Sequence, residues 1–262
     1  MLQQIGCTFS YPELQYEFKS HPTSVNSLQP NPVGNSDAVA GKEVNSINPK
    51  DWATIIFTSG STGSPKAVVH SLANHFYNAL GANERMPLNP GDRWLLSLPM
   101  YHVSGLAILF RTLLSGAAMV IPAKNVSLSK TLLSRSVTHL SLVPTQLHRL
   151  LQTTKGKDSL CQLKLILLGG ASIPETLLEQ SAQLGLNVQT TYGSTEMASQ
   201  VATGKSGFYQ VLPFREVRIA ADNEVEVRGK IGFLGYLDGT GLHQPFDENG
   251  WFKTGDIGLW CS

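Results

Sequence analysis

Apolar and polar positions alternate from residue 52 onward in blocks that predict strands and helices in turn. Short apolar runs of strand length lie at residues 52–57, 94–98, 118–121, 139–143 and 163–168. Helical patterns lie at residues 71–83, with Ser71 as N-cap, at 105–114, and after Pro144 and Pro174. Because parallel strands require crossover connections, this order predicts an α/β fold with a mostly parallel sheet and helices on both faces. Ligands of such sheets bind beyond the carboxyl ends of the strands.

Both ends of the chain depart from this pattern. Residues 19–50 are rich in Pro, Asn and Ser and lack a hydrophobic period, so we expect an irregular lead-in over residues 1–50. After residue 209, the short alternating stretches VRIA and EVEVRG favour β-hairpins. We therefore expect a ligand-binding α/β core at residues 51–208 and a small β-rich region at residues 209–262.

Composition narrows the range of partners. The chain has 20 Lys and Arg against 19 Asp and Glu, without a basic stripe, so neither nucleic acid nor an anionic membrane is expected. No apolar run approaches the roughly 20 residues of a membrane span, and the first residues lack the pattern of a secretion signal. Cys7, Cys161 and Cys261 are odd in number and widely spaced, which suits neither a disulfide framework nor a zinc site. We expect a cytoplasmic protein, and the sequence leaves homo-oligomerisation open.

The clearest chemical signal is the loop TSGSTGSPK at residues 58–66, which follows an apolar strand. Its glycines let backbone N–H groups turn toward an anion, its hydroxyls add donors, and Lys66 adds a positive charge for a phosphate. The loop is not a Walker A motif, because Pro65 stands where that motif requires glycine. A plain Ser/Gly linker is disfavoured, because the apolar run KAVVH follows directly.

This loop resembles the signature of the adenylate-forming superfamily, which contains acyl- and aryl-CoA synthetases, luciferases and the adenylation domains of peptide synthetases. Further segments match that family in order over residues 52–256. They are LPMYHVSG at 98–105, GGA at 169–171, TYGSTE at 191–196 and WFKTGD at 251–256. The resemblance implies the α/β core of the large domain of an adenylate-forming enzyme. Its implied ligands are ATP, Mg²⁺, CoA and a small-molecule carboxylic acid.

The resemblance also implies a role for individual side chains. His102 would border the acyl pocket, Tyr192 would stack on adenine, Thr195 would contact the α-phosphate, Glu196 would hold magnesium, and Asp256 would bind both ribose hydroxyls. The expected catalytic residues are Lys66, His102, Thr195 and Glu196. Nucleotide contacts are expected from Thr58, Ser59, Gly60, Ser61, Thr62, Gly63, Lys66, Gly169, Gly170, Ala171, Tyr192, Gly193, Thr195 and Asp256. Contacts with the acid are expected from His102, Ser104, Arg111, Gly193 and Ser194.

Three of these residues have structural alternatives. His102 could be an ordinary loop histidine, Glu196 an acidic residue favoured at a helix start, and Asp256 a turn-former. A carboxylate after a strand-end turn is, however, also a hard oxygen ligand suited to triphosphate-bound magnesium. The ordered set of motifs favours the functional interpretation of all three.

Arg111 indicates the kind of acid. It lies in LAILFRTLL, where its neighbours on either side are apolar except Thr112, and a helix that is apolar nearly all round is buried. A buried arginine stays charged and needs an anionic partner. Its position about two helical turns from His102 suits a second carboxylate on the substrate. A snorkelling arginine at the helix rim is the alternative.

Within the superfamily, the stretches LLSLPMYHVSG, LVPTQLHRLL and LLGGASIP, together with Arg111, most resemble the bacterial 2-succinylbenzoate–CoA ligases of menaquinone biosynthesis. Their substrate is a dicarboxylic acid, which they activate as an acyl-adenylate and convert to a CoA thioester. Two alternatives remain: another aryl or fatty acyl-CoA synthetase, and a nucleotide-binding fragment without turnover. A Ser/His/Asp hydrolase is disfavoured because the chain has no G-x-S-x-G motif.

The chain also departs from the family pattern. Family members carry a longer portion before the phosphate loop and a small mobile domain with a lysine after the TGD segment. The stretch GFYQVLPFREV lacks the Gly-x-Pro-x-Pro-Gly spelling usual at that position. We therefore expect a fragment that binds ATP and the acid but makes the thioester slowly.

Overall fold

The largest sheet of the protein is built by nine of the described strands. The computed structural model describes residues 6–7, 48–58, 65–205 and 208–260, so the predicted loop residues Ser59, Gly60, Ser61, Thr62 and Gly63 lie outside the described residues. The strand order is β16-β1-β10-β9-β8-β7-β6-β4-β5. Bounds are β1 Gly6–Cys7, β4 Arg93–Leu95, β5 Ala118–Val120, β6 His139–Leu142, β7 Leu165–Gly169, β8 Val188–Ser194, β9 Ser199–Lys205, β10 Phe208–Val211 and β16 Leu259–Trp260.

The neighbours from β5 to β8 run parallel, as the alternation of strands and helices predicts. The chain then turns back at the end of β8, so that β9 and β10 are antiparallel additions. The parallel α/β core expected from the sequence is therefore confirmed.

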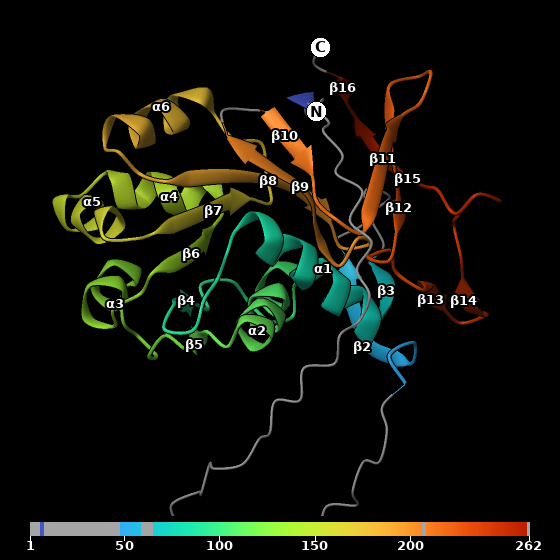
Figure 1. Cartoon of the computed structure of the whole chain (residues 1–262), viewed down its shortest axis with the longest axis horizontal. Coiled ribbons are helices and arrows are strands. Elements are labelled where there is room, and N and C mark those ends of the chain that lie inside the picture. The colour runs from blue at the N-terminus through green and yellow to red at the C-terminus, as the bar shows by residue number, and fades with distance from the viewer. Residues whose placement is uncertain (1–5, 8–47, 59–64, 206–207, 261–262) are drawn as a thin grey trace, which may run out of the picture. The chain divides into compact units, whose positions relative to one another are not determined.

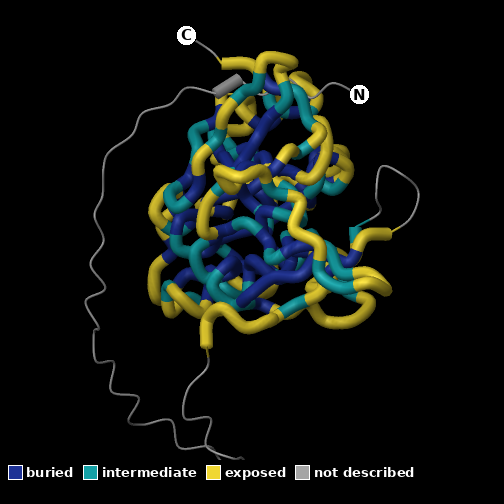
Figure 2. The backbone as a smooth tube through the Cα atoms, turned by 90° about the vertical axis from the view of Figure 1, so that its right-hand side faces the viewer, coloured by how far each residue is buried: buried dark blue, intermediate teal, exposed yellow. Residues whose placement is uncertain are grey.

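Helices pack on both faces of this sheet (Figure 1). Their bounds are α1 Leu72–Arg85, α2 Val103–Ser115, α3 Leu128–Ser134, α4 Pro144–Leu151, α5 Thr154–Cys161 and α6 Glu175–Gln183. Successive residues of β7 face opposite sides: Ile166 and Leu168 pack with α3, α4, α5 and α6, whereas Leu165 and Leu167 pack with α1 and α2. β6 and β7 are consequently buried at every position. In Figure 2 the buried segments run through the interior, and exposed segments surround them.

Two of the predicted helix starts have clear local causes. Ser71 caps α1, since its hydroxyl accepts a hydrogen bond from the Asn74 backbone N–H while the Asn74 side chain accepts one from the Ser71 backbone. Pro144 occupies the first turn of α4, where its missing N–H costs nothing. The sequence did not predict α3 and α5.

The remaining strands form two smaller antiparallel sheets. One has the order β14-β13-β3-β2, with β2 Trp52–Thr58, β3 Lys66–Ser71, β13 Gly235–Asp238 and β14 Gly241–His243. The other has the order β11-β12-β15, with β11 Arg215–Ile219, β12 Glu224–Gly229 and β15 Phe252–Ile257. The β11–β12 pair is the hairpin predicted from VRIA and EVEVRG.

One strand expectation is wrong. Residues 52–57 do form a strand, but β2 pairs antiparallel with β3 and does not begin the parallel sheet. The chain returns at Lys66 as a direct neighbour, which requires no crossover helix. In the described ranges, no helix combines the length and the apolar character that a membrane crossing needs.

Candidate functional site

A cavity of about 390 Å³ opens at the carboxyl ends of β6, β7 and β8 and at the start of α2. This volume lies in the usual range for small-molecule sites. Eight predicted site residues line it: His102, Ser104, Arg111, Gly169, Gly170, Gly193, Ser194 and Thr195. The fold therefore brings together segments that the sequence separates by more than 90 positions, at the edge where parallel sheets bind ligands.

The entrance of α2 is shaped by a close backbone contact. A Cβ atom at Gly105 would lie 2.2 Å from the Pro99 carbonyl oxygen, so only glycine permits the loop to pass this close to the helix. His102 occupies the N-cap position of α2 without a side-chain capping bond, and it is exposed at the cavity. Its ring centroid lies 4.6 Å from that of Tyr101. The imidazole is thus available to a ligand.

Arg111 lies against the cavity and is only 1% exposed. Its Cζ lies 5.3 Å from the centroid of the Trp94 ring, and its Nε has no hydrogen-bond partner among the described residues. Burial lowers the pKa of Arg111 to about 9, with no acidic side chain to offset that effect. The snorkelling alternative is wrong, because the guanidinium does not reach solvent. A buried cation with an open donor beside a cavity requires an anion from outside the chain.

A second buried arginine nearby shows the contrast. Arg215 is 2% exposed, and burial lowers its pKa to about 9. Its guanidinium donates to the backbone carbonyls of Pro213 (3.0 Å), Gln200 and Asn78 (3.5 Å). Arg215 is therefore used by the fold itself, whereas Arg111 keeps an open donor.

Tyr192 and Asp256 meet beside the cavity, although neither lines it. The Tyr192 hydroxyl donates to Asp256 Oδ2 at 2.7 Å, which joins β8 to β15. The backbone N–H of Gly255 donates to Glu224 Oε1 at 2.9 Å, and Thr254 Oγ1 donates to the Val225 carbonyl at 2.7 Å. Asp256 is therefore held in a fixed place next to the aromatic ring.

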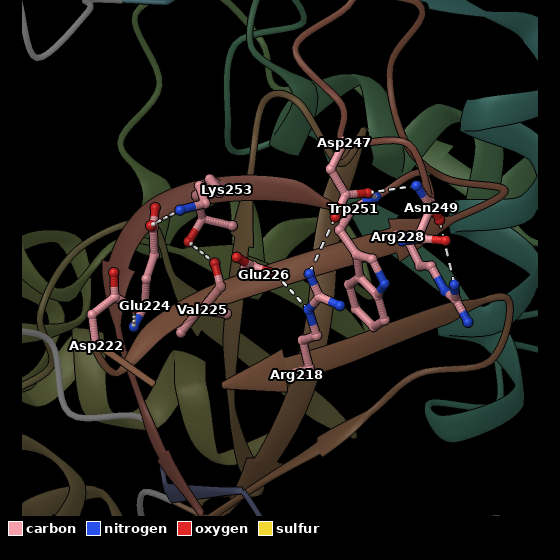
Figure 3. Close-up of polar contacts among 11 residues, drawn as sticks. Arg218, Asp222, Glu224, Val225, Glu226, Arg228, Asp247, Asn249, Trp251 and Lys253 are labelled. Atoms are coloured by element: carbon pink, nitrogen blue, oxygen red, sulfur yellow. Dashed lines mark hydrogen bonds and ion pairs between the residues drawn. The ribbon is translucent and has the colours of Figure 1, made fainter. Parts of the chain in front are cut away.

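The strand that carries Asp256 is anchored at its start by Trp251 (Figure 3). Arg218 and Arg228 place their Cζ atoms 4.4 Å and 4.6 Å from the centroid of the Trp251 ring. Asp247 accepts a hydrogen bond from the Trp251 backbone N–H at 2.8 Å. Sequence reasoning missed this cluster, and the only signal for it was the arginine in each of the two predicted β-hairpin strands.

Lys66 and Glu196 both contact a tyrosine that the sequence analysis missed. The Tyr236 hydroxyl donates to Glu196 Oε1 at 2.8 Å, and Lys66 Nζ lies 4.9 Å from the centroid of the Tyr236 ring. Burial, the Glu196 charge and this hydrogen bond raise the pKa of Tyr236. No sequence pattern pointed to this residue, because its partners lie 40 and 170 positions away.

Two buried histidines support the turn at Thr195. His70 Nε2 lies 2.7 Å from the Thr195 carbonyl oxygen, so Nε2 carries the proton and donates. Thr54 Oγ1 lies 2.8 Å from His75 Nε2, and the His75 ring stacks on Phe110 at 4.9 Å. Burial lowers the pKa of His70 to about 4, and burial together with the neighbouring His70 lowers that of His75 to about 3. Both rings are neutral at physiological pH and act as fixed supports.

The remaining predicted residues lie at the ends of strands or next to them. Thr58 ends β2, Lys66 begins β3, and Ala171 follows β7 outside the cavity lining. Glu196 directly follows Thr195 and is half-buried. Within the described residues, no three His, Cys, Asp or Glu side chains gather into a metal site. A single carboxylate nevertheless fits magnesium that arrives with ATP, since Mg²⁺ is commonly held by one or two carboxylates plus substrate phosphates.

Comparison with known proteins connects this site to one family. The family model described as AMP-binding enzyme matches residues 9–236. The 2-succinylbenzoate–CoA ligase of Salmonella typhimurium is 42% identical over 214 residues, which are 80% of this chain and 45% of that protein. The ligase of the same name from Escherichia coli K12 is 38% identical over 251 residues, covering 94% of this chain and 54% of the relative. The chain therefore spans about half the length of the curated relatives it matches.

Solved structures give the same picture. Wild-type E. coli MenE with a bound phenylether-linked analogue of OSB-AMS superposes with a TM-score of 0.72 and 38% identity, covering 80% of this chain and 46% of that one. The o-succinylbenzoate coenzyme A synthetase of Bacillus subtilis in complex with ATP and magnesium ion gives a TM-score of 0.69 and 30% identity, covering 79% and 47%.

Proposed function

Since the chain belongs to the AMP-binding enzyme family, we propose that it is the nucleotide- and acid-binding part of an ATP-dependent 2-succinylbenzoate–CoA ligase of menaquinone biosynthesis. The relatives named above carry that activity in their names. The observation that carries the substrate class is Arg111, a cation with an open Nε donor, buried beside a cavity. A dicarboxylic acid supplies a second carboxylate for it.

The proposed reaction has two steps. A carboxylate oxygen of the acid attacks the α-phosphorus of ATP, and the bond to pyrophosphate breaks. The CoA thiolate then attacks the acyl carbonyl carbon, and AMP leaves. Neither step needs a covalent bond to the protein, so catalysis rests on positioning and on stabilising charge.

The described residues divide these tasks by their location. The cavity beside His102, Ser104 and Arg111 receives the acid, with Arg111 on the carboxylate that does not react. Tyr192 and Asp256, joined by their hydrogen bond, receive adenine and ribose beside the backbone of residues 169–171.

The phosphates would lie between the acid and the nucleoside sites. Thr195 holds the α-phosphate at the cavity wall, and Lys66 contributes positive charge. Glu196 would hold Mg²⁺, which when bound with ATP offsets the charge of the leaving pyrophosphate. Removing the charge in Lys66→Ala should weaken ATP binding roughly 10- to 100-fold in calorimetry, given the usual value of a charged hydrogen bond. Because Lys66 is exposed, the unfolding free energy should stay nearly unchanged, and an unaltered ATP affinity would remove Lys66 from the phosphate site.

We also propose a cytoplasmic location. The chain has three widely spaced cysteines, and Cys161 is free and exposed. Free thiols of this kind are usual in a reducing compartment.

A single-turnover experiment tests the proposed function. The purified chain, in excess over the acid, is mixed with MgATP and with 2-succinylbenzoate or a fatty acid, and the acyl-adenylate is detected by mass spectrometry. We expect an adenylate of 2-succinylbenzoate and none of the fatty acid. A fatty acyl-adenylate would assign the chain to a different synthetase, and ATP binding without any adenylate would indicate a nucleotide-binding fragment.

A further inference from the structure

Lys66 and Glu196 carry opposite charges and both contact Tyr236, yet they form no ion pair in the part of the chain that the structure describes. Lys66 is exposed and has a long flexible side chain, so attraction alone would draw it toward the carboxylate. A competing contact in the fold would keep the two groups apart. The candidate is the tyrosine that contacts both.

Tyr236 touches each charge with a different part of its side chain. Its hydroxyl donates to Glu196 Oε1 at 2.8 Å, and the face of its ring lies 4.9 Å from Lys66 Nζ. The hydrogen bond uses one carboxylate oxygen and restricts the rotation of the carboxylate. The ring attracts the Lys66 ammonium group by a cation–π contact, which is an alternative to an ion pair with Glu196.

The fold holds this tyrosine firmly. In the pairing of β13 with β3, Tyr236 lies opposite Val68, two residues beyond Lys66. The Phe233 ring packs edge-on against Tyr236 at 4.8 Å, and Phe233 is 2% exposed. The Phe233 backbone N–H also donates to the Glu196 carbonyl oxygen at 2.8 Å. One segment therefore fixes both the main chain and the side chain of Glu196.

We propose that Tyr236 is a positioning residue with two separable actions. Its hydroxyl orients Glu196 for the metal ion that accompanies ATP, and its ring keeps Lys66 from pairing with Glu196, so that Lys66 stays available to a phosphate. This inference rests on the proposed function for the roles of Lys66 and Glu196. The geometry that carries it belongs to the chain itself.

Two variants separate the two actions. Tyr236→Phe removes the hydroxyl but keeps the ring, so only the metal-dependent part of nucleotide binding should suffer. Tyr236→Leu removes both, so Lys66 should move onto Glu196 and weaken phosphate binding as well. Tyr77→Phe is the matched control, because Tyr77 is also half-buried and also has a lysine over its ring, Lys230 at 4.6 Å.

The ligand-bound measurement uses Mn²⁺ as a spectroscopic substitute for Mg²⁺. Electron paramagnetic resonance follows Mn²⁺ binding to each protein in the presence of ATP, and calorimetry without metal gives the affinity for ATP alone. Loss of an orienting partner of a metal ligand typically costs roughly 10- to 100-fold in affinity. We expect Tyr236→Phe to lose about tenfold in Mn²⁺ affinity with unchanged metal-free ATP affinity, and Tyr236→Leu to lose both. Equal Mn²⁺ affinities in the parent and Tyr236→Phe would overturn the orienting action.

A crystal structure of Tyr236→Leu without nucleotide tests the spacing action independently of ligand binding. We expect Lys66 Nζ to lie within ion-pair distance of the Glu196 carboxylate in that variant. If the two groups stay apart, the spacing action is wrong, whatever the chain binds. Failure of the parent chain to bind ATP would instead contradict the proposed function, and the crystal structure would still decide the spacing action.

Discussion

Two regions of the molecule place arginine against tryptophan in opposite electrostatic settings. In α2, Arg111 is 1% exposed beside Trp94, with an open Nε donor and no acidic neighbour to offset its burial. In the sheet of β11, β12 and β15, Arg218 and Arg228 enclose Trp251 from two sides. The contacts between guanidinium and indole are alike in the two regions. The N–H donors of the guanidinium groups differ in whether they have acceptors.

The arginines on Trp251 are satisfied by the chain. Arg218 pairs with Glu226 and with Asp247, and Arg228 pairs with Glu216. They are also partly exposed, with side-chain exposures of 45% and 37%, so solvent completes their hydration. The comparison teaches that stacking on an aromatic ring does not by itself indicate function. An arginine marks a binding site when burial removes water and the fold leaves a donor of the guanidinium without an acceptor.

The largest expected effect comes from truncating the unsatisfied arginine. Arg111→Ala should weaken binding of 2-succinylbenzoate by about 2 to 5 kcal/mol, or roughly one and a half to four orders of magnitude. Arg228→Ala is the control, since its guanidinium lies on Trp251 outside the cavity lining and its loss should leave acid affinity unchanged. Calorimetric titration of both variants with 2-succinylbenzoate in the presence of ATP measures the two affinities. Equal losses of affinity would contradict the difference between the two regions.

The buried histidines differ from both groups of arginines, because a histidine can release its proton and so avoid the free-energy cost of a buried charge. The pKa of His70 is lowered from 6.5 to about 4, so the unfolded chain takes up a proton near pH 6.5 while the folded chain stays neutral until about pH 4. Above pH 6.5 the free energy of unfolding therefore carries no penalty from His70. It falls by about 3 kcal/mol as the pH is lowered toward 4. His75 and His139, whose pKa values are also lowered mainly by burial, act in the same direction.

Urea unfolding between pH 7.5 and 4 measures this loss. His70→Gln keeps a donor for the Thr195 carbonyl but cannot titrate, so its unfolding free energy should fall less steeply over the same range. A parallel decline in parent and variant would mean that other groups carry the pH dependence.

A smaller effect of opposite sign should follow from replacing the buried arginine by an apolar side chain. Arg111→Met removes a desolvated cation and keeps most of the side-chain volume. Replacing buried charge by apolar groups is often stabilising by about 1 to 4 kcal/mol, so the ligand-free variant should unfold at higher urea concentration than the parent. A destabilised Arg111→Met would show that Arg111 supports the fold and is not reserved for a ligand.

The smallest effect is expected in the satisfied region. Arg228→Ala removes one side of the stack on Trp251 and the exposed ion pair with Glu216, which together contribute about 1 kcal/mol. The free energy of unfolding should fall by that amount, measured by urea titration at pH 7. A rise on truncating Arg228 would break the comparison, because it would place this arginine in the same class as Arg111.

The sequence predicted what depends on local pattern. Apolar runs located β4 to β7, Ser71 located the start of α1, and the apolar surroundings of Arg111 predicted its burial. Periodicity could not say which strand pairs with which, so residues 52–57 were assigned to the wrong sheet. The contacts of Tyr236 with Lys66, and of His70 with Thr195, join residues more than 100 positions apart. Nothing within a short window of sequence encodes such pairs. Tyr236 meets Lys66 because β13 pairs with β3 in the smaller sheet, and His70 meets Thr195 where that sheet packs beside the larger one.

The central claim is that Arg111 recognises the carboxylate that does not react, and a double difference tests it most directly. Parent and Arg111→Ala are each titrated with 2-succinylbenzoate and with an analogue of the same shape that lacks the second carboxylate, in the presence of ATP. The account predicts that the diacid loses about 2 to 5 kcal/mol of binding free energy while the monoacid loses almost none, so the coupling is nearly the whole loss. A coupling near zero would contradict the account and would make Arg111 a structural arginine.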